Sequence, residues 1–442
     1  MRLGNNVNMS KGTNSNALKL LIIVNAFHPD RAGGGAVFSD LCYELAGRGF
    51  DVTVRCAYPY YPEWTDKSGR NGWGIWRYQE QGVAVERYGL FIPSRPNSLW
   101  QRLIYEGSFF VSLLRSLRHS GDFDVVMVYC PLAGSVAFAS LLKFYFDKPL
   151  WLNVQDLPAD AATASGISRL GRVNQLLTWV QNTLFNRADV WSSISPIMIH
   201  RLNSIREHNQ PVLYLPNWLH RSLATEIQSF PSKKGRAPEN PVKLLYAGNI
   251  GEKQDLLHFC QTLQKTDAPF KFRIHGDGSQ AEVVAAWIRQ IGDARFHFGP
   301  FLDETGFAKV LHEADFFVVT EKQNSGGSFI PSKLIPGIAS GTPILAVCDT
   351  ASPLGAEMHT AHVGPQYLWT ELDKIPSLIQ RTTEQSDCYL QWQANALRRA
   401  RFYDRERVID RFVVALRTVA ARPDRLDELP SFDDATSKND II

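Results

Sequence analysis

The 442-residue sequence has few cysteines, little net charge and no long apolar run. Its six cysteines are scattered without a CxxC pair, mostly in apolar stretches, which favours buried thiols in a reducing compartment over disulfides or zinc. The net charge of +3 is small for this length, so no basic excess indicates a nucleic-acid partner. No apolar run has the length of a membrane span, and Leu20–Val24 is too short for a signal-peptide core. A cytoplasmic protein is therefore expected.

Two common ligand motifs are also missing. GxGxxG, the dinucleotide-binding fingerprint, is absent. The only DxD is Asp122-Phe123-Asp124, directly before an apolar run, and this position predicts a turn rather than a metal site. We therefore expect neither a dinucleotide cofactor nor a bound metal.

The length and the alternation of apolar runs with helical patterns predict two α/β domains. A strand is predicted over residues 19–24, which are continuously apolar after Lys19, as in a parallel strand covered on both faces, and a helix over 36–48 and a strand over 51–54 follow. Further strands are predicted at 125–129, 150–154, 190–194 and 212–215. This series predicts a doubly wound, Rossmann-like domain over residues 18–228.

A second series of strands follows a linker rich in Pro, Ser and charge at residues 229–241. These strands are predicted at 243–247, 272–275, 295–298, 316–320 and 344–347. They define a second Rossmann-like domain over 242–394, and a helix at about 395–421 is expected to pack back on the first domain. Residues 1–16 and 423–442 are polar and are expected to be disordered.

The stretch TEKQNSGGSFIPSKLIPGIASGTPILAV, residues 320–347, carries the clearest binding signal. A glycine pair that includes Gly327 leads to Ser332 and Lys333, and a helix start is expected there. Backbone N–H groups at a helix start attract phosphate, and a lysine adds a full positive charge. Ser332 would add a hydroxyl for a ribose or a phosphate oxygen. The stretch therefore predicts an anion site.

Three other glycine-bearing segments lie where a strand meets the next loop. Gly33 precedes Gly34 and Gly35 before the first helix, where the backbone must approach a ligand or simply turn tightly. Gly248 and Asn249 follow the first strand of the second domain, and Lys253 comes shortly after. His275, Gly276, Asp277 and Gly278 end the next strand, and the glycines there would let a base or ribose approach. His275 itself is more typical of a hydrogen-bonded structural residue than of a catalyst.

Several segments occur in an order that resembles a known family. They are GGGAVFSDLCYELAGRGFDVTV, PYYPEW, VQDLPADAA, SISPIM, LPNW, LLYAGNIGEKQ, HGDG, and PSK followed by ASGTPI. Together they resemble the retaining family-4 glycosyltransferases of GT-B fold, and especially the colanic-acid-type and fucosamine-type transferases of bacterial surface polysaccharide synthesis. The resemblance covers roughly residues 18–420.

The resemblance implies a nucleotide-sugar donor held mainly by the second domain and an acceptor against the first. It implies no metal, because helix N-termini and basic side chains hold the diphosphate in such enzymes. Lys253 matches the family's diphosphate-binding lysine, whereas Asn249 stands where relatives commonly carry arginine, so Lys333 would supply the second charge. Ser328 and Pro336 stand where many relatives carry a pair of glutamates, which leaves the grip on the donor sugar and ribose unexplained.

Two acids of the first domain are candidate catalytic residues. Asp156 follows a predicted strand, the position where α/β folds place their chemistry, and it matches the family's aspartate. Asp160 matches the second acid. Asp156 would act as a base, or it would orient the acceptor while the leaving diphosphate takes the proton. In a purely structural alternative, its carboxylate would cap the next helix. Asn153 stands where relatives often carry histidine.

Residues 99–119 form an amphipathic, arginine-bearing segment on which Leu99, Leu103, Phe110, Leu114 and Leu117 can share a face. It would lie either on an anionic bilayer or buried on the first domain. Contact with the cytoplasmic face of the inner membrane would suit an acceptor linked to polyprenyl diphosphate, which the resemblance implies.

These observations predict a retaining, metal-independent transferase of hexose-type or N-acetylhexosamine-type sugars in exopolysaccharide, capsule or O-antigen synthesis. Two alternatives remain open. A nucleotide-sugar 2-epimerase shares the paired architecture but would need acids close to the sugar in both domains. A non-catalytic sugar-binding or scaffold protein would explain the missing glutamates.

Overall fold

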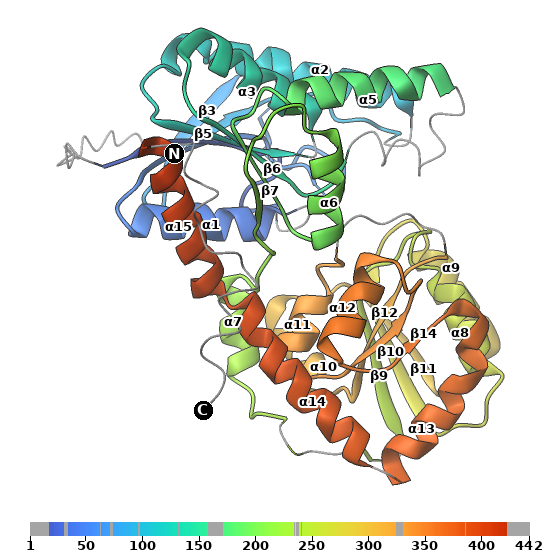
Figure 1. Ribbon diagram of the computed structural model, residues 1–442. Helices are drawn as coiled ribbons and strands as arrows, with labels where there is room; N and C mark the ends of the chain where they lie inside the picture. Colours follow the sequence, from blue (N-terminus) through green and yellow to red (C-terminus); the bar gives the residue numbers. More distant parts are fainter. Residues whose placement is uncertain are drawn as a thin grey trace, which may run out of the picture.

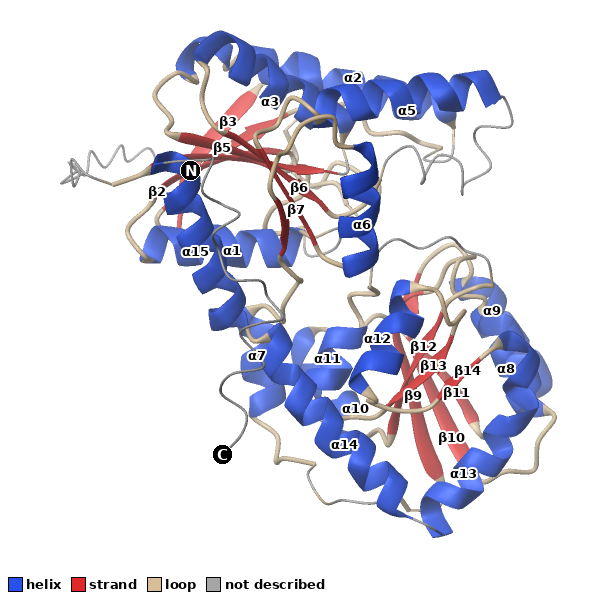
Figure 2. Cartoon of the chain, viewed as in Figure 1, coloured by secondary structure: helices blue, strands red, loops and turns tan. Residues whose placement is uncertain are grey.

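The computed structural model describes residues 17–421, apart from 31–33, 62, 71–73, 96–97, 131, 158–170, 234, 236–237, 240, 324–329 and 385. The described chain is α/β, and it forms two separate sheets that each carry helices on both faces (Figures 1 and 2). The alternating pattern of the sequence predicts this fold class, and the structure confirms it.

The first sheet has eight strands in the order β3-β4-β2-β1-β5-β6-β7-β8. All neighbours are parallel except β3 and β4, which form an antiparallel hairpin at the edge. The hairpin turns at Gln81 and Gly82, and both have positive φ (47° and 83°). The strands are β1 (Lys19–Ile23), β2 (Asp51–Ala57), β3 (Ile75–Glu80), β4 (Val83–Tyr88), β5 (Val125–Cys130), β6 (Leu150–Val154), β7 (Val190–Ser193) and β8 (Val212–Tyr214).

Helices cover both faces of this sheet because successive side chains of a strand point to opposite sides. Leu20 and Ile22 of β1 belong to the core beneath α1 and α15, whereas Leu21 and Ile23 belong to the core beneath α2 and α3. The helices of this half are α1 (Gly35–Gly47), α2 (Leu99–Leu114), η1 (Leu117–His119), α3 (Ala133–Phe146), α5 (Gly171–Phe185), α6 (Pro196–Ile205) and, at the end of the chain, α15 (Arg405–Ala421).

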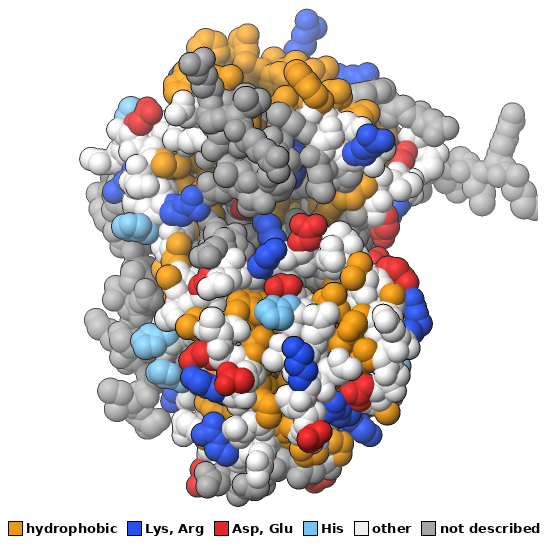
Figure 3. All heavy atoms as spheres, turned by 90° about the vertical axis from the view of Figure 1, so that its right-hand side faces the viewer, with side chains coloured by type: hydrophobic (Ala, Val, Ile, Leu, Met, Phe, Trp, Pro, Cys, Tyr) orange, Lys and Arg blue, Asp and Glu red, His pale blue; other side chains and the backbone are white. Residues whose placement is uncertain are grey.

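Helix α2 buries a different face from the one that the sequence suggested. Tyr105, Phe109 and Leu113 are its buried hydrophobic residues, one helical turn apart, while Leu103 is exposed. Phe110, Leu114 and Leu117 are only partly buried. The opposite face of α2 is apolar as well, so the periodicity of apolar residues does not show which of the two faces is buried. In Figure 3 hydrophobic side chains gather along the upper edge of the molecule, where α2 and α5 lie in Figure 1.

The second sheet is entirely parallel, in the order β11-β10-β9-β12-β13-β14. Its strands are β9 (Val242–Asn249), β10 (Phe270–Asp277), β11 (Phe296–Gly299), β12 (Phe316–Thr320), β13 (Ile344–Val347) and β14 (Gln366–Tyr367). Its helices are α8 (Leu256–Gln264), α9 (Ala281–Ile291), α10 (Glu304–Glu313), α11 (Leu334–Ala339), α12 (Pro353–Ala361), η2 (Trp369–Lys374), α13 (Ile375–Glu384) and α14 (Ser386–Ala400).

The chain crosses between the two halves twice. Helix α7 (Arg221–Gln228) packs on α10 of the second half, although Arg221 also pairs with Glu44 of α1 (2.7 Å). Helix α14 packs on α11, and after η3 (Arg401–Tyr403) the chain returns to the first half as α15. The return therefore begins at residue 405, and residues 395–400 still belong to the second half.

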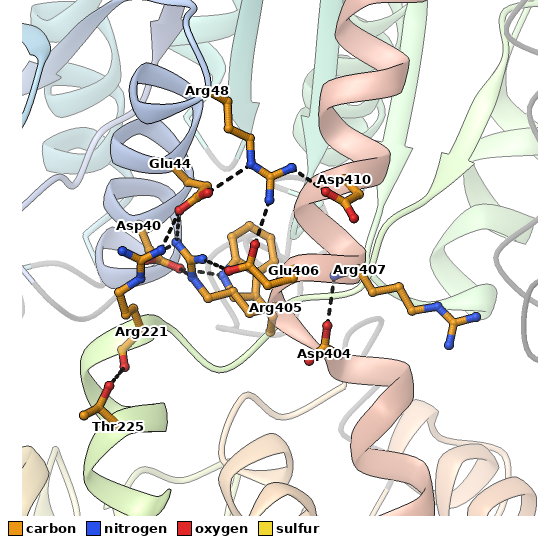
Figure 4. Close-up of polar contacts among 11 residues, drawn as sticks. Asp40, Glu44, Arg48, Arg221, Thr225, Asp404, Arg405, Glu406, Arg407 and Asp410 are labelled. Atoms are coloured by element: carbon orange, nitrogen blue, oxygen red, sulfur yellow. Dashed lines mark hydrogen bonds and ion pairs between the residues drawn. The ribbon is translucent and has the colours of Figure 1, made fainter.

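A cluster of ion pairs holds α15 against α1 (Figure 4). The Arg405 guanidinium donates to both carboxylate oxygens of Asp40 (2.7 and 2.9 Å) and to Glu44 (2.9 Å). Arg48, the residue directly after α1, pairs with Glu406 and Asp410 of α15. Phe412 of α15 also stacks on Trp151 of β6, with 5.7 Å between the ring centroids. Helix α15 therefore completes the core of the first half.

Five of the six cysteines are buried free thiols, as the sequence predicts, and Cys388 is exposed. Residues 121–124 form a turn, and Asp124 accepts a hydrogen bond from the Lys19 backbone N–H (2.8 Å). The turn that the sequence predicts at the single DxD is therefore present.

Candidate donor and acceptor site

Lys333 lies against the carboxyl end of β9. It is the residue before α11, and its Nζ donates a hydrogen bond to the Tyr246 hydroxyl (2.7 Å) while lying 3.9 Å from the centre of the Tyr246 ring. A Cβ added to Gly248 would lie 3.7 Å from the Lys333 Cε. The structure therefore brings together two residues, Gly248 and Lys333, that the sequence singled out 85 positions apart.

Burial and a nearby acid, Glu321, set the pKa of the Lys333 ammonium. Burial lowers the pKa of the Lys333 ammonium to about 7, and the nearby Glu321 carboxylate opposes that shift. Burial raises the pKa of Glu321 to about 7, and one of its oxygens, Oε2, is buried without a hydrogen-bond partner. An amine and a carboxyl group in this state can both change charge when an anion binds beside them.

Glu321 and Tyr246 were missed by the sequence analysis. Tyr246 is two residues before Gly248, so both point to the same face of β9, and this spacing was a usable signal. Glu321 is the first residue after β12, which pairs with β9. A carboxylate directly after a buried strand is the kind of residue that α/β folds bring to a ligand.

Helix α11 is only six residues long, so the charge of Lys333 matters more here than the helix dipole. Pro336 is the third residue of α11, where a backbone N–H would have no partner within the helix anyway. The helix therefore starts at Leu334 and includes Pro336 in its first turn, which resolves how the proline is accommodated. Ser332 is exposed just before it, whereas Gly327 and Ser328 lie outside the described residues.

The glycines at the ends of β9 and β10 are required by packing. Gly248 has a φ of 121°, and a Cβ added to Gly276 would lie 2.0 Å from the Gly248 carbonyl oxygen. Asn249 is exposed and lies beside Gln254. Lys253 is exposed in the same loop, and its carbonyl accepts a hydrogen bond from the Lys322 N–H (2.7 Å), which places its backbone next to Glu321. The structure thus gathers Gly248, Asn249, Lys253 and Lys333 around one strand end.

His275 has a structural environment. It is buried, its ring packs against Gly299, and its Nδ1 lies 3.2 Å from the Pro300 carbonyl oxygen. Burial lowers the pKa of the imidazole, so the neutral form is favoured. This agrees with the structural interpretation of His275 made from the sequence.

In the first half, Gly34 and Gly35 also have packing reasons to be glycine. Gly34 has a φ of 84°, and a Cβ there would lie 2.6 Å from the Tyr129 hydroxyl oxygen. A Cβ on Gly35 would lie 2.0 Å from the Asp30 carbonyl oxygen. A ligand contact at these glycines stays a prediction, because close packing alone explains the residue type.

Asp156 lies two residues after β6, partly buried, and its Oδ1 accepts a hydrogen bond from the Leu157 N–H (2.9 Å). Asp160 lies outside the described residues. Asn153 is fully buried: it donates to the Ser192 hydroxyl (2.9 Å) and accepts from Gln155 (2.8 Å). Gln155 in turn accepts from Asn217 (2.9 Å), so Asn153 belongs to a structural amide network.

Comparison with known proteins shows what the chain is similar to. Residues 32–218 match the family described as a glycosyl transferase 4-like domain. Over 352 residues the chain is 28% identical to the putative colanic acid biosynthesis glycosyl transferase WcaI of Escherichia coli K12, covering 76% of this chain and 85% of that protein.

Solved structures share the two-sheet arrangement. Sucrose-phosphate synthase of Thermosynechococcus elongatus superposes with a TM-score of 0.66 at 14% identity, covering 91% of this chain and 99% of that one. HepE of Anabaena, solved in complex with UDP-glucose, superposes with a TM-score of 0.63 at 13% identity, covering 91% and 100%. The chain therefore carries a glycosyl transferase 4-like domain at residues 32–218 and shares the GT-B fold of these solved structures.

In this glycosyltransferase the position of the second expected glutamate is occupied by Pro336, which is buried inside α11. The acid found beside the candidate site is instead Glu321, on the preceding strand end. Among the residues that the structure describes, no group of three or more His, Cys, Asp or Glu lies close enough together to hold a metal ion. Metal independence of this glycosyltransferase stays a prediction.

Proposed function

We propose that this glycosyltransferase moves a hexose-type or N-acetylhexosamine-type sugar from a nucleotide-sugar donor to a lipid-linked glycan acceptor, with retention of anomeric configuration. The product would enter bacterial exopolysaccharide, capsule or O-antigen. The observation that supports the proposal most directly is the Lys333 amine beside Gly248 at the carboxyl end of β9. The similarity to WcaI supports the polysaccharide context, and HepE was solved with UDP-glucose.

In the proposed reaction, the second half holds the donor diphosphate. Lys333 and Lys253 would balance its charge together with the N–H groups of the loop after β9, without a metal ion. These groups would also stabilise the negative charge that develops on the departing diphosphate as the bond to the anomeric carbon breaks. Glu321 would face the donor from the end of β12, in place of the acid missing at Pro336.

Asp156 would act from the first half. As a base it would take the proton of the acceptor hydroxyl; as an orienting group it would hold that hydroxyl while the departing diphosphate takes the proton. Closure of the two halves over the donor would exclude water, so that transfer competes well with hydrolysis. The reaction would take place at the cytoplasmic face of the inner membrane.

A direct experiment tests the proposal. The purified protein is incubated with a panel of nucleotide sugars and a membrane extract, with EDTA in a parallel reaction. We expect release of free nucleotide together with labelled lipid, in both reactions, and an unchanged anomeric configuration by NMR. An isomerised nucleotide sugar would indicate an epimerase instead, and no turnover of any donor would indicate a binding protein.

A further inference from the structure

Helices α2, α3 and α5 form a continuous layer on the side of the first sheet that faces away from the second half (Figure 1). Helix α3 packs on both α2 and α5. Nine of the thirteen exposed large hydrophobic residues in the described chain lie on these three helices. Trp100, Phe144 and Trp179, one from each helix, are 75%, 77% and 63% exposed. Such clustering exceeds the scattered exposure usual for a soluble surface.

The exposed hydrophobic residues of this layer do not take part in the core of the first half. The same helices bury a separate set of side chains against the first sheet, including Tyr105, Phe109 and Leu113 of α2. Trp100, Ile104 and Val111 are exposed on the same helix and are not needed for that packing. Keeping apolar side chains in water has no benefit for folding, so they are expected to be covered by a partner.

The charges around the surface are mainly cationic. Glu106, the only carboxylate of the three helices, turns to the start of α3, where its Oε2 accepts the Gly134 N–H (3.0 Å), and burial raises its pKa to about 7. Lys143 is matched by Asp147 and Asp189. Arg115 and Arg118 are exposed directly after α2, and the three helices carry no carboxylate besides Glu106 that could pair with them.

An apolar surface that carries tryptophan and tyrosine, with arginines at its margin, matches the interface of an anionic bilayer. None of the helices in the described parts of the chain is long and apolar enough to cross a membrane. We propose that the outer faces of α2, α3 and α5 together dock the protein on an anionic phospholipid bilayer. This docking surface extends well beyond residues 99–119, and it rests on the proposed function, for which it specifies the face that meets the membrane.

Vesicle binding tests the proposal without donor or acceptor, so its failure is distinguishable from a failure of the transferase assignment. The protein is sedimented with phosphatidylcholine vesicles that contain or lack phosphatidylglycerol. We expect binding to the anionic vesicles, and about a tenfold or greater loss of binding in Trp100→Gln/Phe144→Gln/Trp179→Gln. The variant Phe301→Gln, which changes an exposed aromatic residue of the second half, is the matched control and should bind like the parent.

Charge and depth are measured separately. Arg115→Gln/Arg118→Gln should weaken binding to anionic vesicles at low salt, and this difference should shrink at high salt. Brominated lipids should quench the tryptophan fluorescence of the unmodified protein, and the quenching should be weaker in Trp100→Phe/Trp179→Phe. This measurement does not require the triple variant to fold. Absence of vesicle binding, or equal binding by the triple variant, would overturn the proposal. So would a dimer in solution that the triple variant dissociates, because a second copy would then occupy the surface.

Discussion

Lys333 is a partly buried amine whose nearest partners are a tyrosine hydroxyl and a carboxyl group of raised pKa. Such a site is costly to the folded protein, since burial disfavours the charged form. A residue that costs stability and is placed beside an open strand end is typical of a binding function.

The variant Lys333→Met separates that function from folding. We expect donor affinity to fall by about tenfold or more, because a charge-assisted contact to the diphosphate is lost. Thermal stability should be unchanged or slightly higher, since the methionine needs no desolvated charge. Isothermal titration with a nucleoside diphosphate and thermal unfolding give the two readouts. Lys271→Met, at an exposed position of β10, is the control, and equal donor affinity in Lys333→Met and the parent would remove Lys333 from the site.

Donor binding should also depend on pH. In the free protein the Lys333 ammonium has a pKa lowered to about 7, so it loses its proton as the pH rises through that value. Glu321, with its pKa raised to about 7, gains a negative charge over the same range. Both changes disfavour an anion, so affinity should fall above about pH 7, by up to about tenfold per unit for each group.

Proton uptake is the direct measurement of this effect. Binding heats of a nucleoside diphosphate at about pH 8, in two buffers of different ionisation enthalpy, should show protons taken up by the protein. In Lys333→Met the uptake should be smaller. A binding constant that stays flat between about pH 6 and 8.5 would contradict the assigned electrostatics.

Asp156→Asn tests the first half of the site. The Oδ1 bond to the Leu157 N–H is kept by an amide oxygen, so the variant should fold and bind donor. Turnover should fall by about a hundredfold or more, in the range expected for loss of a proton-transferring or orienting group. Steady-state transfer is compared with Asp122→Asn, at an exposed turn position. If the Asp156 variant turned over like the parent, Asp156 would not belong to the site.

The residues of the candidate site show which features a sequence can indicate and which it cannot. Lys333 and Gly248 are both donor-binding candidates from the sequence, because loop glycines and a lysine beside a helix start have recognisable local patterns, and that role stays a prediction. Their closeness to each other, and to Tyr246 and Glu321, was not predicted, since it depends on how β9 and β12 pair within the sheet. Sequence spacing does not encode which strand ends meet.

At the scale of elements, the parallel strands were predictable because they are continuously apolar and lie between helical patterns. The β3-β4 hairpin was missed although it carries a signal, since Gln81-Gly82 joins two alternating strands and both residues have positive φ. β14, with two residues, is too short to give a pattern. The buried face of α2 was misread because both of its faces are apolar.

The ends of β9 and β10 give a prediction at this scale. In Gly276→Ala the new methyl group would meet the Gly248 carbonyl oxygen, so the two strand ends must separate. We expect a loss of about 2–4 kcal/mol of unfolding free energy, measured by urea denaturation. Gly107→Ala in α2 is the matched control, because nothing lies within 4 Å of its new methyl group. It should stabilise the protein by up to about 1 kcal/mol.

For the whole molecule, the cluster around Arg405 determines how firmly α15 closes the first half. In Arg405→Met the carboxylates of Asp40 and Glu44 lose a guanidinium that is largely shielded from solvent. We expect a loss of about 2–4 kcal/mol in urea unfolding, since the Asp40 carboxylate loses its guanidinium partner, whereas Glu44 keeps Arg48 and Arg221. Arg417→Met changes an exposed arginine of the same helix and should cost under about 1 kcal/mol. Equal stability of the two variants would show that apolar packing alone holds α15.

The return of α15 has a consequence for engineering donor choice. Because residues 405–421 rejoin the first sheet, the second half is topologically an insert between two pieces of the first. A chimera that borrows the second half of another enzyme would therefore need two junctions, one near residues 229–241 and one near 401–404. A single splice that also exchanged the terminal helix would leave Trp151 facing a foreign helix in place of Phe412.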